Sequence, residues 1–334
     1  MLIFTVFAQV LLPILIMFSA GWALDRKWGV DLATAVKLNL NLFVPAFIFY
    51  ELTTTRLNGS EALKAVGYTV SVVVVLFAIA ALVARFTKAT REQTRSLQIA
   101  SIFYNSANYG IPLMHLAFPG PAEALQVFVI LVQNIGNFTL GVFLLSSAKH
   151  TGFRALAPIF RQTSVWAVII ALTVRAIFGP ITPDLDVAVS ENTATLSWPI
   201  LDMVGMRWLW VPLKYFHDGL VAVALVTLGV QLSKSKAGAA LPRIRWALVI
   251  RLLVGPVVGL ALVRVFQFHG DLAKAMILST SFPTAVNTAL IAHEFKADTE
   301  YASGAVFWST IFSMFTVTAL IALLRWPAAA WLWG

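Results

Sequence analysis

Apolar residues fill this chain in runs long enough to cross a lipid bilayer, and short polar segments separate the runs. A crossing helix needs about 20 predominantly apolar residues. Windows of that length predict about ten spans. Their expected bounds are 1–24, 31–51, 61–86, 93–117, 121–148, 155–178, 212–232, 242–266, 271–295 and 300–325. The pattern therefore predicts an all-α polytopic membrane protein.

Composition agrees with this class and excludes others. The chain has 334 residues, 59% of them hydrophobic, and a mean hydropathy of +0.84, which is too apolar for a soluble domain. Its net charge of +9 does not gather into one patch, so a nucleic-acid partner is not expected. The absence of cysteine excludes disulfides, thiolate metal sites and thiol catalysis.

Lysine and arginine are more frequent around the odd-numbered connections between spans than around the even-numbered ones. The third connection, for example, is flanked by Arg85, Lys88, Arg91 and Arg95. By the positive-inside rule the odd connections are cytoplasmic and both termini lie outside, in a plasma (bacterial inner) membrane. The run 1–24 has no basic residue before it, which indicates a span rather than a cleaved signal. The longest loop, about 179–211, is either an outward interfacial helix in its second half or an ordered loop without function.

Two spans are interrupted in the middle, and in the same way. Residues 105–112 read Asn-Ser-Ala-Asn-Tyr-Gly-Ile-Pro, and residues 281–288 read Ser-Phe-Pro-Thr-Ala-Val-Asn-Thr. Such polar, proline-containing breaks persist at membrane depth only where protein buries them or where they line a watery cavity. The position of the breaks predicts two inverted five-helix repeats, 1–148 and 155–325, with a transporter's binding site at the breaks.

Four motifs resemble those of the auxin efflux carrier family, in its prokaryotic members. They are Asn41-Leu-Phe-Val-Pro45, Asn105-Ser-Ala-Asn108-Tyr-Gly110-Ile-Pro112, Leu228-Gly-Val-Gln-Leu232 and Pro283-Thr-Ala-Val-Asn287, in the expected order. The resemblance implies a sodium/proton-antiporter-like fold in which the broken fourth and ninth helices cross at their prolines. It also implies a scaffold of spans 1, 2, 6 and 7, a transport domain of spans 3–5 and 8–10, and a homodimer. Family members carry small organic anions such as auxin, malonate or malate.

The breaks supply the chemistry that an anion needs. A broken helix presents free N–H groups where its second half begins, and a carboxylate can bind there without a full protein charge. The predicted substrate-binding residues at the breaks are Asn105, Asn108, Tyr109, Gly110, Pro112, Ser281, Pro283, Thr284 and Asn287. The alternative is that these polar groups only satisfy backbone freed by proline, and that the Tyr109 ring only packs.

Amides outside the breaks are further candidates. Gln133, Asn134 and Asn137 lie within about one helical turn, and Gln133 and Asn137 share a helix face, where they line the site or bond between helices. Asn39 and Asn41 lie on the second span, where they meet substrate from across the barrier or cap the kink before Pro45.

Ionisable residues within spans are costly and therefore informative. Arg251 is either a counter-ion for an anionic substrate or snorkels to the inner interface. His115 follows the first break and either exchanges a proton or stays uncharged. Asp218 either forms a local pair with His217 or takes part in proton coupling. No metal site or cofactor is expected.

The hypothesis is a secondary carrier of a small organic anion that works by an elevator-type movement within the lipid bilayer. A sodium-coupled carrier resembling bile-acid symporters is the first alternative, and a channel is the second. An enzyme is not expected, because His293-Glu294 has no second histidine at metalloprotease spacing and no nucleophile elbow occurs.

Overall fold

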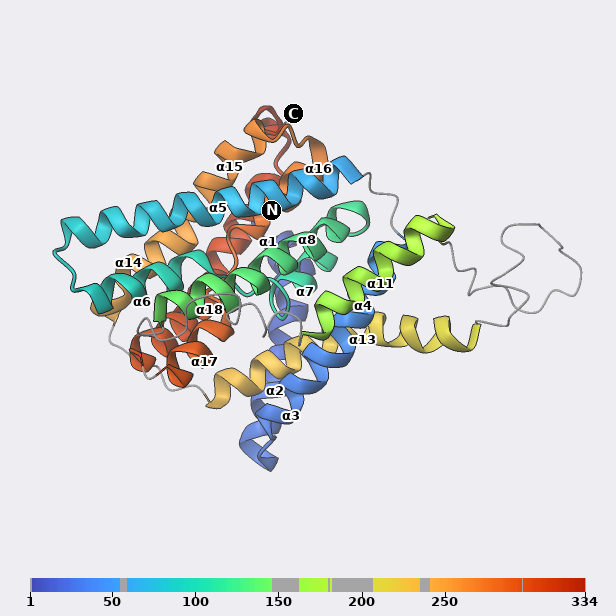
Figure 1. Cartoon of the computed structure of the whole chain (residues 1–334), viewed down its shortest axis with the longest axis horizontal. Coiled ribbons are helices and arrows are strands. Elements are labelled where there is room, and N and C mark those ends of the chain that lie inside the picture. Colours follow the sequence, from blue (N-terminus) through green and yellow to red (C-terminus); the bar gives the residue numbers. More distant parts are fainter. Residues whose placement is uncertain are drawn as a thin grey trace, which may run out of the picture.

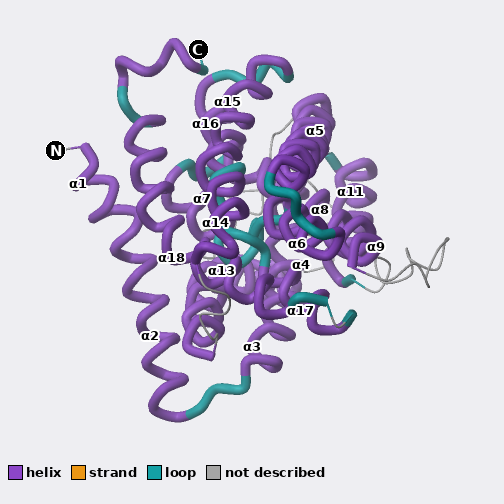
Figure 2. The backbone as a smooth tube through the Cα atoms, turned by 90° about the vertical axis from the view of Figure 1, so that its left-hand side faces the viewer, coloured by secondary structure: helices purple, strands orange, loops and turns teal. Residues whose placement is uncertain are grey.

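The computed structural model describes residues 2–54, 59–145, 162–179, 181, 207–234, 241–295 and 297–333. Within these ranges the regular structure is helical, and loops are short connections between helices (Figures 1 and 2). The extended pairing in this part of the chain is one isolated antiparallel bridge, between Tyr104 and Thr284. The all-α prediction is confirmed.

Seven continuous helices among the described residues are long and apolar enough to span a membrane. They are Phe4–Trp28, Leu32–Thr54, Gly59–Phe86, Pro121–Leu145, Leu209–Lys234, Leu241–Val265 and Thr299–Leu324. A shorter apolar helix, α11, covers Thr163–Phe178. The protein is thus a multi-span membrane protein, while the count of ten spans and the inverted repeat stay predictions.

Four of the seven helices contain a five-residue π-helical segment. These segments are η1 (Phe7–Leu11) between α1 (Leu2–Val6) and α2 (Leu12–Trp28), η2 (Asn39–Phe43) between α3 (Leu32–Leu38) and α4 (Val44–Thr54), η3 (Asn137–Gly141) between α8 (Pro121–Gly136) and α9 (Val142–Leu145), and η5 (Ile250–Val254) between α14 (Leu241–Val249) and α15 (Gly255–Val265). A π-helical segment widens the helix locally and is frequent at functional sites. Asn39, Asn137 and Arg251 all lie on such segments.

Two predicted spans are interrupted where the sequence places the breaks. The first consists of α6 (Arg91–Ile102) and α7 (Gly110–Ala117), and the second of α16 (Gly270–Ser279) and α17 (Val286–Glu294). Figure 1 shows α6 beside α5 (Gly59–Phe86), to which a short turn joins it.

Two expectations about segment bounds fall partly outside the described residues. The predicted span 155–178 is described only from residue 162, and most of loop 179–211 is not described. The end of that loop was placed wrongly, because helix α13 covers Arg207–Lys234 and begins before residue 212. Pro212 lies inside α13, in its second turn, where proline removes one backbone hydrogen bond of the helix.

The connection between α2 and α3 is fixed by local hydrogen bonds. Gly29 ends α2 with a φ of 70°, which an L side chain rarely adopts. Asp31 then caps α3 by accepting the N–H of Thr34 at 3.1 Å. Hydrogen bonds from Thr34 lower the pKa of Asp31, so this cap is charged at neutral pH.

Helices α2 and α13 meet backbone to backbone through glycine. A Cβ atom added at Gly229 would lie 2.0 Å from the carbonyl oxygen of Phe18, and one at Gly21 would lie 2.1 Å from that of Val226. Small residues allow such close approach between membrane helices, where packing replaces the hydrophobic effect. The contact explains the glycine in the Leu228-Gly229 motif.

The helices pack in two groups. In one group, α1 and η1 lead into α2, which packs on α13, as do α3, η2 and α4, and α4 also packs on α11. In the other, α5, α6, α7, α8, α14, α15, α16, α17 and α18 (Thr299–Leu324) pack on one another. The described contacts between the groups include α13 with α7, α4 with α8, and α1 with α18.

We expect Gly229→Leu to reduce the stability of the protein, because the new side chain must force α13 away from α2. Overpacking of this kind costs about 1–3 kcal/mol or more. The melting temperature of the purified protein in detergent measures the effect. Gly59→Leu is the matched control, since a Cβ there meets no atom within 4 Å. Equal melting temperatures for the two variants would contradict the prediction.

Candidate functional site

The two helix breaks bind directly to each other. The N–H of Asn105 donates to the carbonyl of Pro283 at 2.8 Å, and the N–H of Ala285 donates to the carbonyl of Phe103 at 3.0 Å. These two bonds form the bridge between Tyr104 and Thr284. Each break thereby satisfies part of the backbone that the other exposes, which hydrocarbon could not do.

The carbonyl ends of the first half-helices are satisfied by side chains. Thr284 Oγ1 donates to the carbonyl of Ala100 at 2.8 Å, and Arg251 Nη1 donates to that of Ser101 at 3.0 Å. At the end of α16, Arg251 Nη2 donates to the carbonyl of Thr280, and Tyr68 Oη donates to that of Met276 at 3.0 Å. The negative end of each half-helix therefore has dedicated donors.

The amide ends of the second half-helices have fewer backbone partners. Within the described residues, the N–H groups of Val286 and Asn287, in the first turn of α17, form no backbone hydrogen bond. The same holds for the N–H groups of Ala107 and Asn108 before α7. All four residues line one cavity. The positive ends of two half-helices thus open into the same space.

This cavity has a volume of about 40 Å³. Its walls come from η2 and α3, from both breaks and from the region where α8 joins η3. The lining residues are Val36, Leu40, Tyr104, Asn105, Ser106, Ala107, Asn108, Asn134, Asn137, Ala285, Val286, Asn287 and Leu290. Four of the predicted substrate residues are brought together here: Asn105, Asn108, Asn137 and Asn287. Thr284 does not line the cavity; its N–H donates to Ser309 Oγ and its Oγ1 to the carbonyl of Ala100.

Two of the lining amides are buried with an unused polar atom. Asn105 is 7% exposed and its Nδ2 has no partner, and Asn137 is 1% exposed and its Oδ1 has none. An unpaired buried polar group costs about 1–3 kcal/mol. Such groups at a cavity wall are available to a ligand or to water.

Asn39, rather than Asn41, meets the first break. Asn39 is fully buried and its Nδ2 donates to Oδ1 of Asn108 at 2.7 Å. Asn41 is exposed, donates to the carbonyl of Lys37 at 3.0 Å and accepts from Thr163 Oγ1 at 3.2 Å. Both asparagines occur in the same polar run, but only the side of η2 that carries Asn39 faces the break.

The glutamines of α8 hold the first break in place. Gln133 Oε1 accepts the N–H of Tyr104 at 3.1 Å, and Gln126 Nε2 donates to the carbonyl of Ser106 at 2.8 Å. Gln133 thus contacts backbone, not the cavity. Sequence reasoning missed Gln126, although its spacing of seven residues from Gln133 places both on one helix face.

The other predicted residues of the breaks are structural in this geometry. The ring of Tyr109 lies 5.9 Å from that of Phe282, and Ser313 Oγ donates to its hydroxyl at 3.1 Å. A Cβ at Gly110 would meet Phe282 at 2.6 Å, which explains the glycine. Pro112 is buried in α7, and Ser281 Oγ donates to the carbonyl of Leu278 at 2.6 Å.

None of the three ionisable candidates lines the cavity. Arg251 is fully buried, and its guanidinium carbon lies 4.6 Å from the centre of the ring of Tyr104, a lining residue of the cavity. His115 Nδ1 lies 3.0 Å from Glu123 Oε1. Asp218 pairs with Lys214 at 2.6 Å and with His217 at 2.9 Å.

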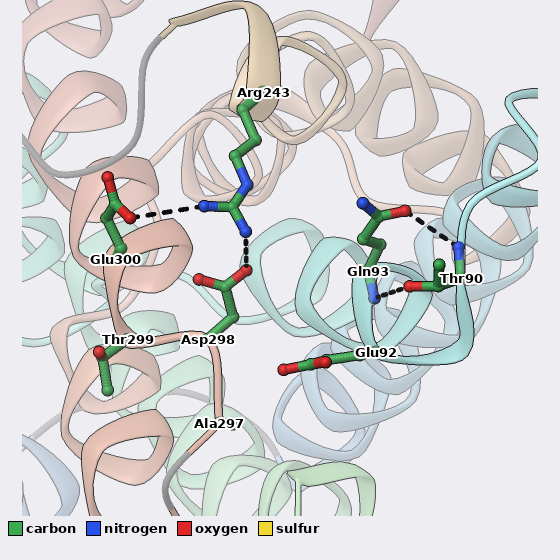
Figure 3. Close-up of a pocket in the computed structure, with 8 residues that line it drawn as sticks. All are labelled: Thr90, Glu92, Gln93, Arg243, Ala297, Asp298, Thr299 and Glu300. Carbon is green, nitrogen blue, oxygen red and sulfur yellow. Dashed lines mark hydrogen bonds and ion pairs between the residues drawn. The ribbon is translucent and has the colours of Figure 1, made fainter.

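A larger cavity of about 440 Å³ lies between the starts of α6 and α18 (Figure 3). Figure 3 shows Arg243 reaching from α14 toward Asp298 and Glu300. The Arg243 nitrogens lie 2.5 Å from Asp298 Oδ2 and 3.6 Å from Glu300 Oε2. Thr90 and Gln93 face each other in a capping box at the start of α6. Because its lining holds three carboxylates, those of Glu92, Asp298 and Glu300, and one cation, Arg243, this cavity is a weaker candidate for an anion.

A multi-span helical bundle with two mutually bonded helix breaks defines the class of protein as a membrane transporter. Comparison with known sequences agrees: the sequence model of one family, described as membrane transport protein, matches residues 5–321. The chain therefore belongs to this family of membrane transport proteins, the one that contains the auxin efflux carriers.

A distant relative is also a transporter. The chain is 23% identical to an uncharacterized transporter of Methanothermobacter thermautotrophicus over 318 residues, which cover 94% of this chain and 97% of the relative. The match extends across both breaks and across both groups of helices.

We expect Gln133→Leu to reduce stability by about 1–3 kcal/mol, because the N–H of Tyr104 is left buried without an acceptor. A lower melting temperature of the purified protein measures the loss. Gln9→Leu, at an exposed position of η1, is the control and should be neutral. An unchanged melting temperature for Gln133→Leu would show that the break is held without this bond.

Proposed function

We propose that the protein is a secondary carrier of a small organic anion, such as a mono- or dicarboxylate, and that the anion binds in the cavity at the crossing of the two breaks. The observation that carries this proposal is the convergence of the free N–H groups before α7 and in the first turn of α17 on one cavity. Helix N-termini bind carboxylates and phosphates through such groups.

The charge distribution around the cavity supports an anion. No Asp or Glu is among its lining residues, and the amides of Asn105, Asn108, Asn134 and Asn287 add side-chain donors. Among the described residues no group of three or more His, Cys, Asp or Glu side chains could hold a metal ion. The site therefore favours recognition by dipoles and amides, which suits several carboxylates.

The size of the cavity supports a moving site. A volume of about 40 Å³ holds a few waters or one carboxylate group, but not the body of a dicarboxylate. Binding of the whole anion therefore requires that the walls part. The wall of Val36 and Leu40 belongs to the first helix group and the remaining walls to the second, so the groups are the natural parts to separate.

The proposal includes an elevator-type movement, which this division supports. The scaffold would consist of spans 1, 2, 6 and 7, and the transport domain of spans 3–5 and 8–10, with ten crossing segments arranged as two inverted repeats. The hydrogen bond from Asn39 to Asn108 joins the two parts, so it breaks when the transport domain moves. Under the positive-inside assignment both termini face outward from a bacterial inner membrane.

The first test is counterflow of labelled mono- and dicarboxylates into proteoliposomes without an ion gradient. We expect saturable accumulation of at least one acid, and a fall of tenfold or more in Asn287→Ala and Asn108→Ala. The reason is that each variant removes an amide from the cavity wall. Asn41→Ala is the matched control and should transport like wild type, because Asn41 lies outside the cavity.

Three outcomes would contradict the proposal. Flux that rises linearly with concentration and shows no counterflow would indicate a channel. Uptake of a bile-salt-like compound that depends on an imposed sodium gradient, with no carboxylate transported, would favour a sodium-coupled symporter. Wild-type transport by well-expressed Asn108→Ala and Asn287→Ala would place the site elsewhere.

A further inference from the structure

Arg251 has an unusual position for a membrane-embedded cation. It is fully buried, and it forms none of the ion pairs found among the described residues. A charged side chain at membrane depth is costly unless other groups compensate it. The compensating groups therefore identify what this arginine does.

Those groups are the carbonyl ends of both broken helices. Nη1 donates to the carbonyl of Ser101, in the last turn of α6, at 3.0 Å, and Nη2 donates to the carbonyl of Thr280, which follows α16. The C-terminal end of a helix carries a partial negative charge of about half an electron. One guanidinium thus neutralises the negative ends of two half-helices from spans that are far apart in sequence.

The local packing is built around this contact. Arg251 lies on the π-helical segment η5, and the next residue along that face, Gly255, allows close approach. A Cβ at Gly255 would lie 2.6 Å from the carbonyl oxygen of Thr280 and 2.9 Å from Arg251 Nη2. The face of the Tyr104 ring covers the guanidinium at 4.6 Å, as a cation–π contact.

In transporters with discontinuous helices, half-helix C-terminal ends and unwound carbonyls coordinate a coupling sodium ion or proton. We propose that Arg251 takes the place of such a coupling ion: it is a permanent cation of the protein that neutralises these carbonyl ends. The anion at the neighbouring amide ends then binds without sodium at the crossing. The transport part of this inference rests on the proposed function, whereas the cation-binding part does not.

A buried arginine can act on a bound anion in two ways, by a direct ion pair with it or by neutralising nearby carbonyl ends. Arg251 is not among the residues that line the substrate cavity, whereas Tyr104, whose ring it contacts, is. It acts on the anion by cancelling the negative potential of the carbonyl ends and not by a direct ion pair. Replacement should therefore change the ionic requirement of the protein more than its choice of acid.

The test is the melting temperature of the purified full chain, measured at increasing concentrations of NaCl. Choline chloride makes up the remaining salt, so that the ionic strength stays constant. The melting temperature of the wild-type protein should not change with the sodium concentration. Arg251→Ala should be less stable in choline and should regain stability in sodium, because the ion can enter the vacated space beside the two carbonyls. With a dissociation constant of about 15 mM, 150 mM sodium would raise the ratio of folded to unfolded protein about tenfold.

Two controls accompany this variant. Arg245→Ala removes an exposed arginine from the same span and should be insensitive to sodium like wild type. Arg251→Lys keeps a cation at the site, so it should also be insensitive, and it serves as the readout if Arg251→Ala does not fold. Counterflow of the transported acid by wild type should be equal in sodium and in choline.

Saturable stabilisation of wild type or of Arg251→Lys by sodium would overturn the proposal. So would an Arg251→Ala protein that folds and gains nothing from sodium. If no acid is transported while the melting temperatures behave as expected, the proposed function fails and the inference about Arg251 stands. If an acid is transported but transport by wild type requires sodium, the proposed function stands and the inference about Arg251 fails.

Discussion

The structure depends on the mutual hydrogen bonding of two helix breaks at membrane depth. Either break alone would leave buried N–H and carbonyl groups without partners, which a bilayer interior cannot satisfy. The pair of bonds between residues 103–105 and 283–285 removes part of this cost, and side chains from α8, α18 and η5 remove more. The amide ends that stay without backbone partners are those that line the cavity.

The breaks and the membrane class could be predicted from the sequence because both have strong local causes. Proline next to several Asn, Ser and Thr residues in a long apolar run interrupts a helix in any context. The choice among polar side chains could not be predicted in the same way. Asn39 and Asn41 are two residues apart on one helix and so point to different sides of it, and only the packing of that helix shows that Asn39 is the one that meets the break.

Arg251 illustrates a second limit of sequence reasoning. An arginine inside a span is informative, but the sequence leaves both a substrate counter-ion and a snorkelling side chain open. Its actual partners are main-chain carbonyls of Ser101 and Thr280, which have no signature in the sequence. Only the position of the two half-helices, about 150 and 30 residues away along the chain, identifies them.

The glycine contact between α2 and α13 has a consequence for motion. Two helices that touch through main-chain atoms at Gly21 and Gly229 have a single register, because a shift of one residue along either axis would drive a side chain into the partner's backbone. This interface cannot serve as a sliding surface. A displacement between the two helix groups would instead have to occur at the contacts between them, which include those of α13 with α7, α4 with α8 and α1 with α18.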